Sequence, residues 1–111
     1  MSFALTERQL LDGTKTVTRR LGWAFLAPGD KLLAVRKCMG LKKGEKQHAL
    51  GTIRVKSVRR ESLDWAVAPG EAAREGFPEM TGAQFVLFFC EHMKCGPLRL
   101  VTRIEFERVG Q

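Results

Sequence analysis

Residues 11–20 read LDGTKTVTRR. The part from Thr14 to Arg20 is rich in β-branched residues, which favour extended backbone, so we expect a strand there. Its concentration of lysine, threonine and arginine is unusual for a plain strand and indicates side chains with a function. A short helix is expected just before it, over residues 6–13, because Thr6 is a suitable N-cap and Gly13 a suitable terminator.

Three further strands are predicted on the C-terminal side of this segment. The turn at residues 27–30 leads into an apolar strand over 31–37, and a strand with alternating buried and wet positions follows over 50–59. The clearest alternation of all covers residues 98–109. Between the first two lies a polar, lysine-rich segment, residues 40–47, which we expect to form a mobile basic loop.

Helices are expected between the second and the last of these strands. Pro69 and Gly70 begin a short helix that runs through Glu75, and Thr81 is a fair N-cap for an amphipathic helix reaching Met93. Strands before and after helices, without repeated strand–helix–strand units, predict an α+β fold with a mainly antiparallel, curved sheet. A small, partly closed barrel fits the length.

Length and composition place the chain among globular proteins. Its 111 residues suit one domain, residues 1–111, and the 44% hydrophobic and 28% charged residues exclude disorder and coiled coil. No apolar run approaches the ~20 residues that span a bilayer, and the charged N-terminus does not resemble a secretory signal. We therefore expect a cytoplasmic protein without membrane contact. Three cysteines without a Cys-x-x-Cys pair are expected to be free thiols.

Positive charge is concentrated in the first part of the chain. Residues 1–60 contain fourteen basic and four acidic residues, whereas residues 61–111 contain five and eight. This asymmetry favours a polyanionic partner such as RNA, but a merely solubilising surface explains it equally well. Aromatic residues are sparse among the basic ones, so an extended base-stacking platform is not expected.

Four landmarks in this order resemble the ASCH domain family, which has a PUA-like β-barrel. The first is Gly-x-Lys-Thr-x-Thr followed by arginine, at residues 13–20. The others are Pro-Gly-Asp at 28–30, Glu-Gly-Phe at 75–77 and the closing strand around 101–106. The resemblance covers nearly the whole chain and implies a cleft for RNA or nucleotide-like ligands.

The resemblance also implies an activity and a set of site residues. Some small bacterial members of the family are amidohydrolases that remove the acyl group of N(4)-acetylcytidine with a lysine, a threonine and a glutamate, which fall here on Lys15, Thr18 and Glu75. No metal or cofactor is expected. The predicted ligand-binding residues are Arg19, Arg20, Trp23, Lys42, Lys43 and Lys46.

The implied chemistry places a demand on the local structure. A threonine hydroxyl needs a base within ~2.6–3.2 Å, and a lysine can serve if burial lowers its pKa. Lys15 and Thr18 are three positions apart, which in a regular strand places their side chains on opposite faces. The hypothesis therefore requires a turn or bulge between them. Glu75 would then give a proton to the departing amine.

Other interpretations of the same residues remain open. The lysine and threonines can be ordinary strand residues, and Glu75 a solvated surface carboxylate. The lysine-rich segment 40–47 and the long segment around 62–69 depart from the family pattern, and they leave room for a non-catalytic RNA-binding module or a ribonuclease. Cys90, His92 and Cys95 do not have the spacing of a zinc site, so no metal is predicted there.

Overall fold

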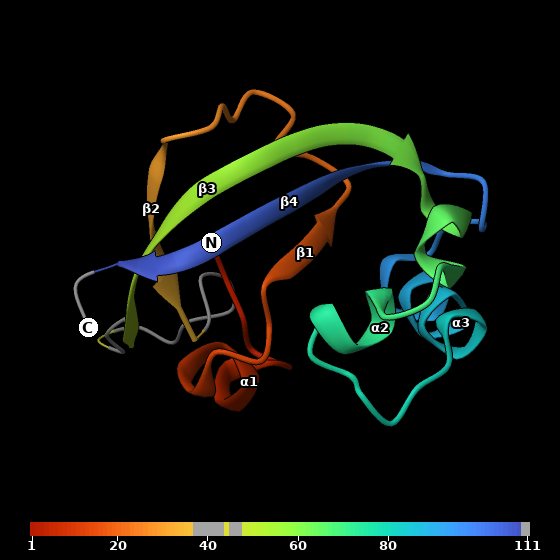
Figure 1. Ribbon diagram of the computed structural model, residues 1–111, viewed down its shortest axis with the longest axis horizontal. Helices are drawn as coiled ribbons and strands as arrows, with labels where there is room; N and C mark the ends of the chain where they lie inside the picture. The colour runs from red at the N-terminus through yellow and green to blue at the C-terminus, as the bar shows by residue number, and fades with distance from the viewer. Residues whose placement is uncertain (37–43, 45–47, 110–111) are drawn as a thin grey trace.

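The computed structural model describes residues 1–36, 44 and 48–109. Most of the predicted loop at 40–47 lies outside the described residues, and with it Lys42, Lys43 and Lys46. The elements, labelled in Figure 1, are α1 (Glu7–Asp12), β1 (Val17–Arg20), β2 (Lys31–Val35), β3 (Ala49–Ser62), the 3₁₀-helix η1 (Leu63–Val67), α2 (Glu71–Arg74), α3 (Gly82–Met93) and β4 (Leu100–Val109).

The four strands form one antiparallel sheet in the order β1-β4-β3-β2. The long strands β3 and β4 arch across the molecule together, with a bulge between Val55 and Ser57 where β3 pairs with β4 (Figure 1). An extra residue in one strand increases its bend and twist, which accounts for the curvature. The predicted α+β fold with a curved antiparallel sheet is therefore confirmed.

The predicted closure into a barrel is not observed in the described part of the chain. β1 and β2 lie at opposite edges of the sheet, and the N-terminal segment runs beside β2 through a bridge between Ser2 and Val35. Arg20, at the end of β1, donates a hydrogen bond to the Ser2 carbonyl at 2.7 Å. A side-chain contact links the two edges instead.

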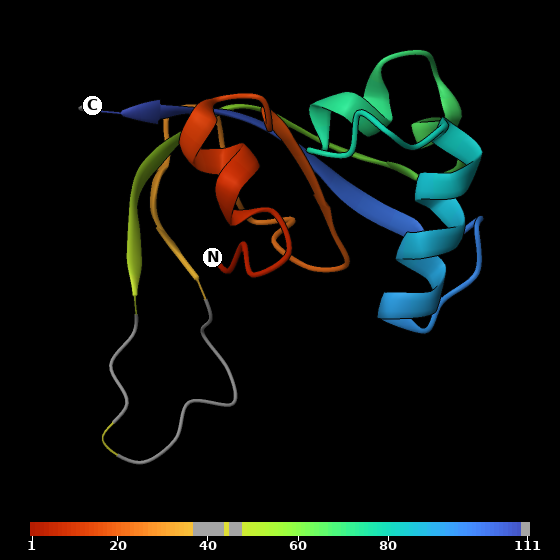
Figure 2. The ribbon, with the colours of Figure 1, turned by 90° about the horizontal axis from the view of Figure 1, so that it is seen from below.

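Helices cover two regions of this sheet. α1 lies near the C-terminal half of β4, whereas η1, α2 and α3 gather at its N-terminal end (Figure 2). α3 begins with a capping box in which Thr81 and Gln84 exchange side-chain-to-backbone hydrogen bonds, as the sequence predicts for a Thr81 cap. Thr6 is the N-cap residue of α1, but its side chain makes no capping bond.

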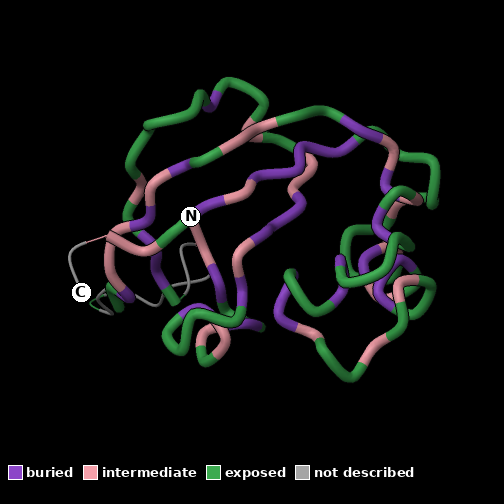
Figure 3. Tube along the Cα trace, in the orientation of Figure 1, coloured by how far each residue is buried: buried purple, intermediate pink, exposed green. Residues whose placement is uncertain are grey.

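The buried residues of the sheet are concentrated on β1 and on the adjacent strand β4. Val17, Ile104 and Phe106 belong to a buried stripe along β1 and β4 (Figure 3). One apolar cluster packs under α3 around Leu63 and Phe85, and another packs under α1 around Phe3 and Ile53. Buried charged residues of β1, β3, β4 and α2 occupy the same end of the sheet as α3. Because burial of charged groups is costly, a buried cluster of this kind indicates a functional site.

Candidate functional site

A cavity of about 240 Å³ lies along the outer edge of β1. One wall is polar and consists of Lys15, Thr18, Arg19, Arg20 and Glu75. Residues 2–6 of the N-terminal segment form a second wall. Because β1 is an edge strand, residues from both of its faces reach the same cavity, and consecutive side chains such as Thr18 and Arg19 both line it.

Lys15 and Glu75 meet inside this cavity. Lys15 Nζ donates to the Glu75 backbone carbonyl at 2.6 Å and lies 3.3 Å from Glu75 Oε1, with both side chains buried. Burial lowers the pKa of Lys15; Glu75 opposes this shift, and the positive charge of Arg20 adds to it. The neutral amine is therefore easier to reach here than on an exposed lysine.

Lys15 lies before the first residue of β1, while Thr18 lies within it. Residues 14–16 have no regular secondary structure, and β1 pairs with β4 without a register shift, so the turn or bulge that the sequence hypothesis required is not found there. Both side chains nevertheless line the same cavity, because Lys15 lies outside the alternation of the strand. Lys15 N is held by the Gln9 carbonyl, and Thr16 N by the Arg74 carbonyl. The contacts described for these residues include no hydrogen bond between Lys15 and Thr18.

The Thr18 hydroxyl has a different partner. Arg20 Nε donates to Thr18 Oγ1 at 3.1 Å, and Arg20 Nη2 donates to the Ser2 carbonyl at 2.7 Å. The Arg20 guanidinium carbon also lies 5.0 Å from the centre of the Phe3 ring, a cation–π distance. Arg20 is thus fixed between the edge of β1 and the N-terminal segment.

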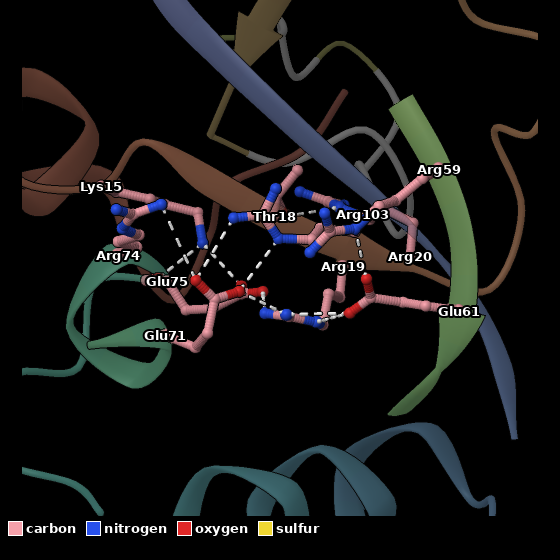
Figure 4. A network of polar contacts seen from close by, with 10 residues as sticks. All are labelled: Lys15, Thr18, Arg19, Arg20, Arg59, Glu61, Glu71, Arg74, Glu75 and Arg103. Atoms are coloured by element: carbon pink, nitrogen blue, oxygen red, sulfur yellow. Dashed lines mark hydrogen bonds and ion pairs between the residues drawn. The ribbon is translucent and has the colours of Figure 1, made fainter. Parts of the chain in front are cut away.

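Arg19 lies at the centre of a buried ion-pair network (Figure 4). Its guanidinium donates to Glu75 Oε2 at 2.9 Å, to Glu61 Oε2 at 3.0 Å and, through a short bond, to Glu71 Oε1. No part of the Arg19 side chain is exposed. These three carboxylates accept from four of its five N–H groups, so Arg19 is placed to hold Glu75, and its contact with a ligand stays a prediction.

The network includes residues that the sequence did not indicate: Glu61, Glu71 and Arg103. Arg103 chelates Glu71 with bonds of 2.9 and 3.2 Å, and Arg59 donates to Glu61 at 2.6 Å. Burial alone would raise the pKa of Glu71, but the hydrogen bonds and charges of Arg103 and Arg19 lower it to about 2. The sequence feature that could have indicated Arg103 is the alternation of charged and apolar residues along β4. Alternation alone, however, assigns Arg103 to a solvent-exposed face of the sheet.

Another part of the cavity lining is aromatic. Phe77, Phe85, Phe88 and Phe89 line it, together with His92 and Met93 near the end of α3. The Phe77 and Phe88 ring centres are 5.1 Å apart, and those of Phe88 and His92 are 4.3 Å apart. One polar and one aromatic wall suit a flat ligand with a polar edge, of roughly the size of a nucleobase.

Comparison with known proteins gives matches among solved structures only. No family model matches the chain, and no curated protein matches it. A crystal structure of an ASCH domain from Lactobacillus crispatus JV V101 superposes with a TM-score of 0.61 and 20% identity over 95% of this chain and 70% of its own. The chain has the fold of an ASCH domain.

A second solved structure shares this ASCH fold. It is a protein of Enterococcus faecalis V583 from the family DUF984, with a TM-score of 0.61 and 19% identity. The match covers 94% of this chain and 69% of the other. The predicted ASCH-like order of landmarks therefore corresponds to the observed order of elements, from the turn before β1 to the closing strand β4.

Trp23, which is also a predicted ligand-binding residue, lies elsewhere in the ASCH fold. Trp23 packs against the cluster of Leu26, Val55 and Ile104, and its ring centre is 5.5 Å from that of Phe25. It is not among the residues that line the cavity. Lys42, Lys43 and Lys46 lie outside the described residues. Of the three predicted ligand-binding residues that the structure describes, Arg19 and Arg20 line the cavity and Trp23 does not.

Much of the basic half is paired with carboxylates within the ASCH fold. Arg36 pairs with Glu7 at 2.8 Å, Arg54 with Glu107 at 3.3 Å, and Lys15 and Arg19 pair with Glu75. Glu75 and Glu107, which belong to the second half, therefore neutralise part of the charge that the sequence places in the first. A count of charges along the chain overstates the cationic surface.

Residues 1–36, 44 and 48–109 contain no helix with the length and apolar character needed to cross a membrane. The same residues contain no group of three or more histidine, cysteine, aspartate and glutamate side chains arranged to hold a metal ion. Cys90 and Cys95 are free thiols, and burial raises the pKa of Cys90.

Proposed function

We propose that this ASCH-fold protein hydrolyses the amide of an N(4)-acylated cytidine in the cavity beside β1. Thr18 is the nucleophile, Lys15 the base and Glu75 the group that passes a proton to the leaving amine. The observation that carries the proposal is that these three residues line one cavity, in which Lys15 contacts Glu75 across 60 positions of sequence.

The base is supported by the surroundings of Lys15. A lysine acts as a base only as the neutral amine, and burial lowers the pKa of Lys15 toward the range where that form is populated. Its hydrogen bonds to Glu75 fix the amine in one position. The contact from Lys15 to the Thr18 hydroxyl is expected to form when substrate is bound, because catalytic contacts often tighten only then.

The reaction proceeds in two balanced stages. In the first, Thr18 Oγ1 attacks the acyl carbon and its proton passes to Lys15 Nζ. The carbon–nitrogen bond then breaks, and the proton travels from Lys15 through Glu75 to the cytosine N4 as cytidine leaves. In the second, a water attacks the Thr18 ester while Lys15 accepts one water proton. The bond between the acyl carbon and Thr18 Oγ1 then breaks, the Thr18 oxygen takes that proton back from Lys15, and the carboxylic acid leaves.

Substrate binding is assigned to the aromatic wall. A pyrimidine ring packs well against phenylalanine side chains such as Phe77 and Phe88, while its exocyclic amide points toward the polar wall. The cavity volume of about 240 Å³ lies below the ~300–1,000 Å³ of pockets for drug-sized ligands, which favours a compact substrate. The ribose would then lie at the mouth.

RNA binding by the basic half is the competing function. The ion pairs of Arg19, Arg36 and Arg54 reduce the number of cations available to phosphates. The charge count of residues 1–60 therefore supports RNA binding less strongly than the sequence suggests. An RNA-binding module would show a log affinity that falls with log salt at a slope near ~0.7–0.9 per phosphate contacted. It would show no loss of acyl groups.

The test is a turnover assay on N(4)-acetylcytidine, with cytidine measured by chromatography. The wild type should release cytidine, and Thr18→Val, Lys15→Met and Glu75→Gln should each lose nearly all turnover while remaining folded. Because the three residues act as a unit, the double variants should lose no more than the single ones. Thr52→Val is the matched control, since Thr52 lies on β3 outside the cavity.

Two outcomes would overturn the proposal. The first is a wild type that leaves every acylated cytidine in the panel intact. The second is a Thr18→Val variant with the turnover of the wild type. Salt-dependent retention of an RNA oligonucleotide without hydrolysis would then assign the protein to the RNA-binding class.

A further inference from the structure

Arg20 contacts the proposed nucleophile directly. Its Nε lies 3.1 Å from Thr18 Oγ1, and the geometry is that of a hydrogen bond in which the guanidinium donates. In a strand, residues two apart point to the same face, so Thr18 and Arg20 are neighbours by construction. The contact therefore depends on the strand itself and exists before any ligand arrives.

We propose that Arg20 is a catalytic residue that holds the Thr18 oxygen and stabilises the negative charge that this oxygen acquires as its proton passes to the base. This inference rests on the proposed function. It differs from the sequence expectation, in which Arg20 binds the ligand. Here its partner is an atom of the enzyme that takes part in the reaction.

The hydrogen-bonding capacity of a hydroxyl explains the benefit. A threonine hydroxyl has one proton to donate and two lone pairs. Arg20 occupies one lone pair, which leaves the other for the acyl carbon and the proton for a base. An arginine stays protonated at all accessible pH values, so Arg20 cannot remove that proton itself. The contact thus orients the Thr18 proton away from Arg20, toward the rest of the polar wall.

The position of Arg20 is set by the N-terminal segment. Arg20 Nη2 donates to the Ser2 carbonyl at 2.7 Å, and the guanidinium lies over the ring of Phe3. Phe3 is itself buried, with its ring centre 5.8 Å from that of Phe106 on β4. A donor fixed in this way needs little rearrangement at the moment of reaction, which is the condition for strong electrostatic stabilisation.

The same cation also acts on the proposed base. After burial and the opposing effect of Glu75, the charge of Arg20 is a cause of the lowered pKa of Lys15. Loss of this charge should therefore make Lys15 harder to deprotonate. A residue that only fastened the N-terminal segment to β1 would not be required to act on the pH dependence of turnover in this direction.

The test compares Arg20→Gln and Arg20→Ala with the wild type on N(4)-acetylcytidine. Loss of a preorganised donor typically lowers kcat by ~10²–10³, and we expect a fall of that order with little change in KM. The rising limb of the kcat/KM profile should move to higher pH. Added guanidinium ion at low concentration should restore part of the Arg20→Ala rate without activating the wild type.

Arg60→Gln is the matched control. Arg60 Nη1 also donates to a threonine hydroxyl, that of Thr102 at 2.6 Å, and to the Leu21 carbonyl at 3.3 Å, but Arg60 does not line the cavity. Its replacement should leave kcat and the pH profile unchanged. Circular dichroism of each variant separates lost activity from lost structure.

The outcomes separate this inference from the proposed function. If the wild type turns over the substrate and folded Arg20→Gln keeps its kcat and its pH profile, the assignment of Arg20 is wrong and the proposed function stands. A loss of rate without a shift in pH profile and without guanidinium rescue would make Arg20 a structural residue. A wild type without turnover removes the proposed function and this inference together.

Discussion

Arg19 Nη1 lies 2.9 Å from Glu75 Oε2, with the whole Arg19 side chain buried. Lys15 contacts the other oxygen of the same carboxylate, so Glu75 is held from two sides. Arg19 extends this arrangement to Glu61 on β3 and Glu71 on α2. The proposed proton-transfer group is therefore fixed by a network that joins the edge strand to the rest of the fold.

Replacement of Arg19 should lower the free energy of unfolding substantially. In Arg19→Met, three buried carboxylates lose a shared cation, and the breaking of a buried pair typically costs ~3–5 kcal/mol. Urea unfolding followed by tryptophan fluorescence measures this. Arg36→Met, which breaks the exposed pair with Glu7, is the control and should unfold close to the wild type. Equal stability of the two variants would contradict the account of the network.

The network also predicts the acid response of the protein. Because the pKa of Glu71 is lowered to about 2 in the folded state, its ion pairs contribute stability above the unfolded value near ~4.3, and this stability is lost as pH falls toward 2. In Glu71→Gln, unfolding free energy should be lower at pH 7 and should fall less steeply between pH 5 and 2. Parallel curves for wild type and variant would count against a buried, ionised Glu71.

Turnover should depend on the deprotonation of Lys15. With its pKa lowered by burial, kcat/KM should rise with pH through an apparent pKa below the ~10.4 of an exposed lysine. Lys15→Arg retains a cation beside Glu75 but cannot supply a neutral amine, so it should fold and be inactive. A Lys15→Arg enzyme with wild-type turnover would show that Lys15 is not the base.

The packing of α3 on η1 leaves no space at Gly82. An added Cβ there would overlap the Cα and the carbonyl group of Val67, which belong to the backbone. Gly82→Ala should therefore lower the free energy of unfolding by ~1–3 kcal/mol through overpacking. Gly96→Ala is the control, because nothing lies within 4 Å of a Cβ at that position. Thermal melts of the two variants compare them directly.

The elements of the fold were largely predictable because each has a local signal. The alternation along β4, the turn before β2 and the Thr81 cap each depend on residues that are close together in the sequence. The structure has these elements close to the expected positions. Closure of the sheet was not predictable in this way. It depends on how far the edge strands extend, and β1 is only four residues long.

The residues of the candidate site likewise divide into those with a local sequence signal and those that depend on distant parts of the chain. Lys15 and Thr18 were indicated by a motif, and Glu75 by its order in the chain. Glu61 and Arg103 were missed because burial of a charge depends on partners from distant segments, and Arg19 is 42 residues from Glu61. Arg19 itself resembled a ligand-binding residue because a free arginine and a buried, ion-paired one have the same sequence signal.

The most direct test of the account is the site of acylation during turnover. Wild-type protein mixed with excess N(4)-acetylcytidine is quenched with acid, digested and analysed by mass spectrometry. The account predicts an acetyl group on Thr18 in the wild type, together with released cytidine, and neither in Thr18→Val. An acetyl group on another residue, or release of cytidine by Thr18→Val at the wild-type rate, would contradict it.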